Sequence, residues 1–81
     1  MILTNLERRG RMQWELYKLR KDNNKTQKDL AEYLGIDEAT YRLKEKGRQQ
    51  FKQNEMFAIS VLFDKKVDDI FLPTNFTVRK V

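Results

Sequence analysis

Apolar residues in this chain recur at the spacing of short helices, with brief polar interruptions between them. Over 11–22, Met12, Leu16 and Leu19 stand at i, i+4 and i+7, which places them on one face of a helix. The sequence Asp-Asn-Asn at 22–24 favours a turn and predicts the end of this helix. Alternation typical of strands is absent before the last residues, so the pattern predicts an all-α fold.

Two further helices are predicted in close succession. Thr26 suits the N-cap of the first, Asp29 stands where a carboxylate completes a capping box, and Gly35 favours its end. Asp37 suits the N-cap of the next helix, over 38–46. A connection of two or three residues forces a sharp crossing of the two helices, so this segment predicts a helix-turn-helix.

The last third of the chain predicts two more helices and a short tail. A helix over 53–63 carries Ile59 and Phe63 on one face and is apolar over much of the rest, which is typical of a helix in a core or at an interface. A short fifth helix is predicted over 67–71, ahead of a proline. The tail over 73–81 alternates weakly, so it is either disordered or a strand that pairs with another segment, such as its copy in a dimer.

Charge and composition narrow the range of functions. The 81 residues contain neither Cys nor His, which excludes thiol chemistry, disulfides, haem and zinc-finger ligation, and catalysis by histidine. The net charge of +5 lies entirely within 1–52, whereas 53–81 is neutral. This distribution favours a polyanion-facing surface backed by a core or dimer surface, although basic residues could also serve only for solubility.

No membrane or export segment is predicted. The longest apolar stretch, 57–63, is interrupted by Ser60 and is far too short to span a bilayer. The first residues do not resemble a signal peptide. We therefore expect a cytoplasmic protein with an N-terminal basic segment (1–10), a helix-turn-helix domain (11–72) and a C-terminal tail (73–81) that is a candidate dimerisation strand.

The segment Thr-Gln-Lys-Asp-Leu-Ala-Glu-Tyr-Leu-Gly-Ile at 26–36 resembles the helix-turn-helix of lambda-repressor-like regulators of the xenobiotic-response-element type. The similarity extends over about 12–72, and the segment 40–47 is similar to short phage-type regulators. It implies a five-helix domain with the helix-turn-helix at its second and third helices. It also implies a sequence-specific transcriptional regulator, a repressor of bacterial or phage origin, that binds an operator as a homodimer through the major groove of double-stranded DNA.

Site residues follow from the same resemblance. It implies base contacts from Glu38, Ala39, Arg42 and Leu43. It implies contacts to the DNA backbone from Gln27 and Thr40. Basic residues at the two edges of this face are expected to add phosphate contacts: Lys25, Lys28, Lys46 and Arg48. The resemblance further implies a structural ion pair between Arg20 and Glu45. No cofactor, metal or small-molecule ligand is expected.

Some of these residues have a second interpretation. Arg42 could form a bidentate pair with guanine, or only an ion pair with Glu38 four residues earlier. Glu38 could accept from cytosine N4, or only stabilise the helix N-terminus. The cluster of Arg8, Arg9 and Arg11 could form a minor-groove arm or only solubilise the chain.

Three lysines depart from the family pattern. Lys44 occupies a usually apolar position, so its stem is expected to snorkel over the core. Lys52 and Lys66 precede the last two helices where Ser or Thr caps are common, so these helices are expected to depend on packing.

Two other function classes compete with DNA binding. A protein-interaction module, such as an antitoxin or antirepressor, would fit the acidic and apolar side chains of Asp37, Glu38 and Leu43. An enzyme is disfavoured, because no nucleophile–base set, glycine-rich phosphate loop or metal cluster is visible.

Overall fold

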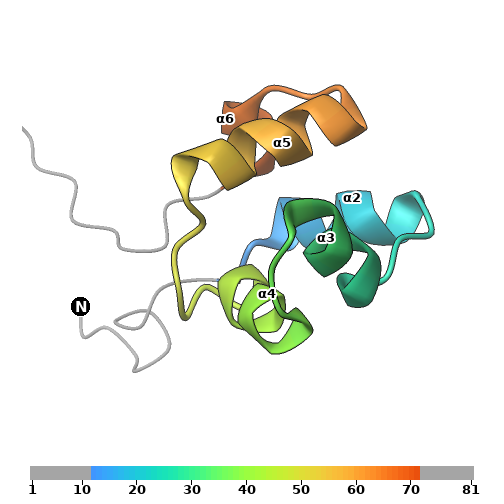
Figure 1. Cartoon of the computed structure of the whole chain (residues 1–81). Coiled ribbons are helices and arrows are strands. Elements are labelled where there is room, and N and C mark those ends of the chain that lie inside the picture. Colours follow the sequence, from blue (N-terminus) through green and yellow to red (C-terminus); the bar gives the residue numbers. More distant parts are fainter. Residues whose placement is uncertain (1–11, 72–81) are drawn as a thin grey trace, which may run out of the picture.

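Five helices and no strand make up residues 12–71, which are the residues described by the computed structural model (Figure 1). The helices are α2 (Trp14–Asp22), α3 (Gln27–Leu34), α4 (Glu38–Glu45), α5 (Gln53–Phe63) and α6 (Val67–Ile70). The all-α prediction is confirmed for this part of the chain. The candidate tail strand and the N-terminal arginine cluster lie outside the described residues.

The first helix begins later than predicted, at Trp14 and not at residue 11. Gln13 precedes it, and the backbone N–H of Gln13 donates to the carbonyl of Glu45 at 2.8 Å. This bond to the end of α4 fixes the chain before the helix starts, and apolar spacing along the sequence contains no sign of it. The short helix α6 also ends one residue before the predicted limit, since Phe71 is extended.

Local side-chain bonds set the ends of α3 and α4. Thr26 Oγ1 accepts from the N–H of Asp29 at 3.0 Å, and Asp29 Oδ2 accepts from the N–H of Thr26 at 2.8 Å, so the predicted capping box is present. These two hydrogen bonds lower the pKa of Asp29. Gly35 adopts a left-handed φ of 70° that ends α3, and Asp37 caps α4 by accepting from the N–H of Ala39.

Each helix contributes a fully buried hydrophobic side chain to a shared core. These side chains are Leu16, Leu30, Tyr41, Ile59 and Ile70. The rings of Tyr41 and Phe51, and of Phe51 and Phe71, meet edge to face at 5.9 and 5.1 Å between centroids. Helix α4 packs closely across α3, where the small residue Ala31 is buried.

The expected snorkelling of Lys44 is wrong. Its side chain is 2% exposed, and its Nζ lies 2.6 Å from Glu55 Oε1. The same carboxylate oxygen accepts from the backbone N–H of Lys52 at 2.8 Å, so α5 has an acceptor at its start despite the missing Ser or Thr. A buried ion pair therefore joins α4 to α5. The Lys44 ammonium can be buried because Glu55 supplies the acceptor that it needs within the protein.

Candidate nucleic-acid interface

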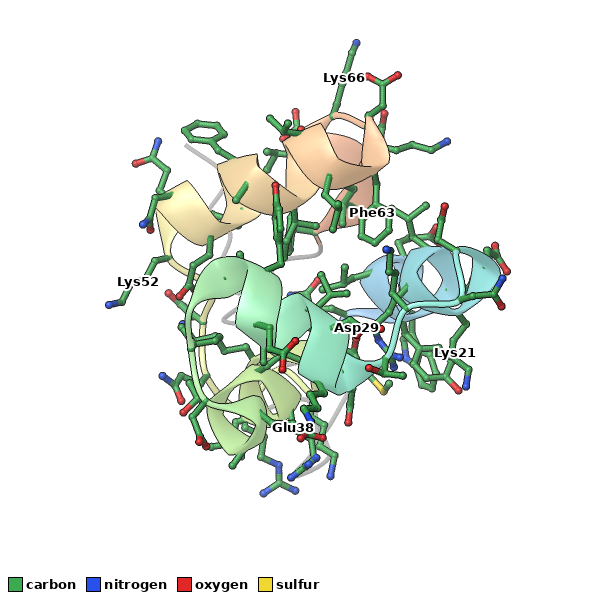
Figure 2. All side chains as sticks on the ribbon, turned by 45° about the vertical axis from the view of Figure 1, so that its right-hand side comes forward. Lys21, Asp29, Glu38, Lys52, Phe63 and Lys66 are labelled. Atoms are coloured by element: carbon green, nitrogen blue, oxygen red, sulfur yellow. The ribbon has the colours of Figure 1, made fainter. Side chains whose placement is uncertain are left out.

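The residues predicted to contact bases share one exposed face of α4. Glu38 and Ala39 lie in its first turn, and Arg42 and Leu43 lie one turn later on the same side. Leu43 is 44% exposed and the Arg42 side chain 43% exposed, whereas Thr40 is half-buried. Figure 2 shows Glu38 at one end of the domain and Lys66, which precedes α6, at the opposite end.

Basic residues border this face in sequence on both sides. Lys25 and Lys28 flank the start of α3, and Lys46 and Arg48 follow the end of α4; all four are exposed. The first N–H groups of a helix have no partner within the helix, so the start of α3 also attracts anions.

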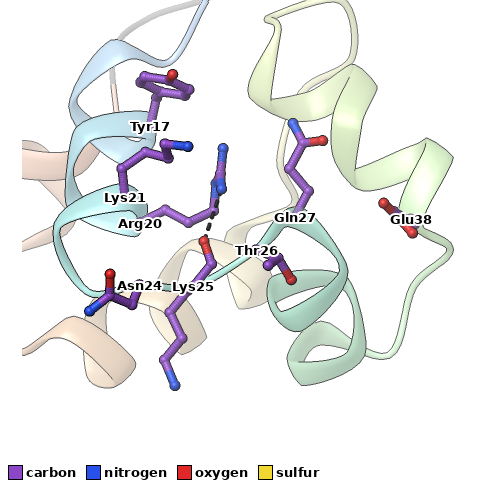
Figure 3. A pocket seen from close by; sticks show the side chains of 8 residues that line it. All are labelled: Tyr17, Arg20, Lys21, Asn24, Lys25, Thr26, Gln27 and Glu38. Atoms are coloured by element: carbon purple, nitrogen blue, oxygen red, sulfur yellow. Dashed lines mark hydrogen bonds between the residues drawn. The ribbon is translucent and has the colours of Figure 1, made fainter.

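A cleft of about 680 Å³ opens beside the start of α3 (Figure 3). Its lining combines three cations with one carboxylate and polar groups: Tyr17, Arg20, Lys21, Asn24, Lys25, Thr26, Gln27 and Glu38. The excess of positive charge suits an anionic group, and the nearby helix N-terminus adds to this preference.

Sequence reasoning missed Tyr17 and Lys21 as part of this cleft. Both lie on α2, four residues apart, and therefore on one side of the helix. That spacing was available in the sequence, but only the tertiary arrangement, in which α2 packs on α4 and α6 and shares the cleft with the start of α3, makes it part of a site. In Figure 3 these two side chains and Arg20 reach into the cleft from α2, and Gln27 enters it from α3.

Arg20 and Glu45 form a buried, bidentate ion pair. Arg20 Nε lies 2.8 Å from Glu45 Oε2, and Nη2 lies 3.1 Å from Oε1. Tyr41 donates its hydroxyl to the same carboxylate at 2.8 Å, and Arg20 Nη1 donates to the carbonyl of Lys25 at 2.9 Å. The pair thus connects α2, the loop before α3 and the end of α4, which fixes the direction of α4.

Burial and the charge of Glu45 shift the pKa in opposite directions at Arg20 but in the same direction at Tyr41. Burial alone would lower the pKa of Arg20, but the hydrogen bond and charge of Glu45 outweigh it and raise that pKa. Burial raises the pKa of Tyr41, and the neighbouring Glu45 carboxylate raises it further. Both shifts favour a charged Arg20 and a neutral Tyr41 that donates its hydroxyl.

A row of hydrogen bonds leads from this pair to the exposed face of α4. Gln27 Nε2 donates to Glu45 Oε1 at 3.0 Å, and Arg42 Nε donates to Gln27 Oε1 at 3.3 Å. Arg42 Nη2 in turn donates to Glu38 Oε2 at 3.2 Å, so the ion pair weighed for Arg42 is present. The contacts of Gln27 with Glu45 and Arg42 were not predicted. Gln27 lies on α3, and the other two residues lie on different turns of α4.

No other chemistry is evident in the described part of the chain. Residues 12–71 contain no group of three carboxylate, histidine or cysteine side chains that could hold a metal ion. Among their helices, none has the length and apolar character needed to cross a membrane.

Residues 16–70, well over half of the chain, match the model of the helix-turn-helix family. The chain matches no curated protein significantly. The matched region contains all five helices apart from the first two residues of α2. This chain therefore belongs to the lambda-repressor-like helix-turn-helix family, a family of DNA-binding transcription regulators.

Proposed function

We propose that the protein is a sequence-specific transcriptional repressor of bacterial or phage origin, of the short, xenobiotic-response-element type. It occupies an operator in double-stranded DNA as a homodimer, with α4 in the major groove. The observation that carries this proposal is the exposed face of α4, whose direction is fixed by the buried Arg20–Glu45 pair. Occupying a promoter requires no chemistry, which agrees with a chain that lacks His and Cys.

Each side chain on this face suits a different base edge. Arg42 can donate two hydrogen bonds to O6 and N7 of guanine. Ala39 and Leu43 can pack against thymine methyl groups. Glu38 can accept from cytosine N4, although its charge repels the phosphates on either side.

Phosphate contacts are proposed for the two borders of the face. Lys25 and Lys28 at the start of α3, and Lys46 and Arg48 after α4, supply exposed positive charge. Two further contacts come from Thr40 and from Gln27, the first residue of α3, whose backbone N–H points out of the helix start.

A homodimer is proposed because one module of this size buries too little surface for tight, specific binding. Helix α5 offers a surface for it, since Phe57 is 55% and Val61 76% exposed and the two are four residues apart. Tyr33 of α3 is also exposed and donates its hydroxyl to the carbonyl of Ala58, which places it beside α5. We call these three exposed side chains, Tyr33, Phe57 and Val61, the α5 patch.

The test is selection of bound duplexes from a random library with the full chain. We expect a pseudo-palindrome with half-sites about one helical turn apart. Arg42→Ala should then lower discrimination at one base pair by about 5- to 150-fold, with an unchanged fold. Lys46→Ala should weaken binding to every sequence and reduce its salt dependence. Failure to enrich any sequence would contradict the proposal.

A protein-interaction module remains the second candidate, supported by the acidic Glu38 and the exposed Leu43 on the same face of α4. An antitoxin or antirepressor of this kind would bind a protein partner through α4. Its binding would depend little on salt and would not be competed by DNA, in contrast to binding by the proposed repressor.

A further inference from the structure

We infer that Gln27 is a positioning residue whose side chain orients Arg42 for base recognition. This inference rests on the proposed function, because it requires that Arg42 contacts a base. It assigns the side chain of Gln27 to contacts within the protein and its backbone N–H to a DNA phosphate.

The geometry around Gln27 carries this inference. Its half-buried side chain extends from the start of α3 into the cleft (Figure 3). There it donates to Glu45 Oε1 at 3.0 Å and accepts from Arg42 Nε at 3.3 Å. Each polar end of the amide therefore has one partner within the protein.

A side-chain amide suits these two neighbours for a chemical reason. The Glu45 carboxylate can only accept hydrogen bonds, and the Arg42 guanidinium can only donate them. A group between them must donate on one side and accept on the other. A second carboxylate would repel Glu45, and an ammonium could not accept from Arg42, whereas the neutral amide of Gln27 satisfies both.

The anchor at the inner end of this row is rigid. Glu45 is 1% exposed and accepts from Arg20, Tyr41 and Gln27. A fixed Glu45 holds Gln27, and Gln27 holds the Nε of Arg42. The Nη1 group of Arg42 and one N–H of Nη2 remain for the two acceptors of guanine. Ordering Arg42 before DNA arrives reduces the entropy lost on binding.

The test compares binding of the full chain to its selected duplex and to duplexes changed at the base pair that Arg42 reads. Gln27→Met keeps the length of the side chain but removes both hydrogen bonds. We expect it to lower discrimination at that base pair by at least about fivefold. Combining it with Arg42→Ala should add no further loss of discrimination. Gln53→Met is the matched control, because Gln53 is exposed and is likewise the first residue of its helix.

A phosphate contact by the Gln27 side chain would give a different result. Gln27→Met would then weaken binding to all duplexes equally, reduce the salt dependence and add to Arg42→Ala. That result would overturn the inference, as would full discrimination by Gln27→Met.

Gln27→Lys separates the two roles further. An ammonium can donate to Glu45 and to phosphates but cannot accept from Arg42. We expect stronger binding to unrelated DNA together with lost discrimination at the base pair of Arg42. Stronger binding with discrimination intact would contradict a positioning role.

A measurement on the free protein makes the inference independent of DNA. In NMR spectra of the wild type, the Arg42 Nε–H should exchange with water more slowly than that of exposed Arg48. Gln27→Met should remove this difference. Circular dichroism should show that the variant keeps its fold. Equal exchange in the wild type would overturn the inference. A slowly exchanging Arg42 in a protein that selects no DNA sequence would instead refute the proposed function, and with it the role in recognition.

Discussion

Glu38 is the residue whose charge fits a DNA-facing surface least. It lies in the first turn of α4, where a carboxylate interacts favourably with the helix dipole, and it pairs with Arg42 at 3.2 Å. Both side chains are more than 40% exposed, so the pair contributes little to stability. In the proposed complex with DNA, the pair acts mainly on binding, because the carboxylate repels phosphates and holds one donor of Arg42.

We predict that Glu38→Gln tightens binding to DNA of any sequence by a few-fold, about 1 kcal/mol, because it removes a like charge near the phosphates. Fluorescence anisotropy at two salt concentrations would measure this, and unfolding stability should change by less than about 0.5 kcal/mol. Glu32→Gln, an exposed carboxylate on α3, is the control. A selective loss at one C·G pair would show instead that Glu38 accepts from cytosine.

At the level of the helices, two buried ion pairs hold α4 in place. Arg20–Glu45 ties its end to α2, and Lys44–Glu55 ties it to α5. Lys44 and Glu45, which are neighbours in α4, thus form ion pairs with two different helices. Removing one member of a buried pair leaves an uncompensated buried charge, which is more damaging than losing both members.

We predict that Lys44→Met destabilises the fold by about 3 kcal/mol, because it leaves the Glu55 carboxylate buried beside an apolar group. The double variant Lys44→Met with Glu55→Gln should recover part of this loss, since the neutral amide still accepts from the N–H of Lys52. Urea unfolding measures both, with exposed Lys18→Met as the control. A double variant less stable than Lys44→Met would contradict this account.

The same pair predicts a dependence of stability on acid. Burial alone would raise the pKa of Glu55, but the hydrogen bonds from Lys44 and from the N–H of Lys52 lower it below its usual 4.5. The unfolded state therefore binds a proton first as the pH falls. The stability contributed by Glu55 is complete above about pH 4.5 and is lost as the pH falls through the lower pKa of the folded state.

We expect Glu55→Gln to flatten the fall in unfolding free energy between about pH 5 and pH 3 relative to the wild type. Urea midpoints across this range would measure the effect. Asp29→Asn serves as a comparison, because the capping hydrogen bonds also lower the pKa of the exposed Asp29 carboxyl. An unchanged slope in Glu55→Gln would show that Glu55 does not carry the acid dependence.

Across the whole domain, α4 and α5 lie on opposite sides of α3 in both Figure 1 and Figure 2. The proposed DNA-contacting face and the α5 patch are therefore separate surfaces. A dimer formed through the α5 patch would leave α4 of each protomer uncovered for its half-site.

We predict that Val61→Glu, at the most exposed side chain of the α5 patch (76% exposed), converts the proposed dimer to a monomer without unfolding it. Sedimentation would report the monomer, and affinity for the two-half-site duplex should fall towards that for a single half-site. Ser60 is next to Val61 but half-buried, so Ser60→Glu would not be a suitable control. Asn54 is exposed and lies near the start of α5, so Asn54→Glu serves as the control. A Val61→Glu dimer would place the interface elsewhere.

The sequence by itself determined the features that depend on residues close together in the chain. The capping box of Thr26 and Asp29, the turn at Gly35 and the cap at Asp37 were all predicted, because each involves contacts within about five residues. The exposed face of α4 could be predicted for the same reason, since a helix repeats every 3.6 residues. These local rules, joined to the family resemblance, gave the helix-turn-helix.

Only the tertiary structure decided most of the contacts between polar groups of different helices, apart from the Arg20–Glu45 pair, which the family resemblance implied. The start of α2 depends on a bond to Glu45, and the burial of Lys44 depends on Glu55, eleven residues away. Gln27 reaches Arg42 because α3 and α4 cross at a particular angle, which helical periodicity does not specify. Periodicity fixes the face on which a residue lies, whereas its partner depends on how the helices are rotated against each other by packing of the shared core.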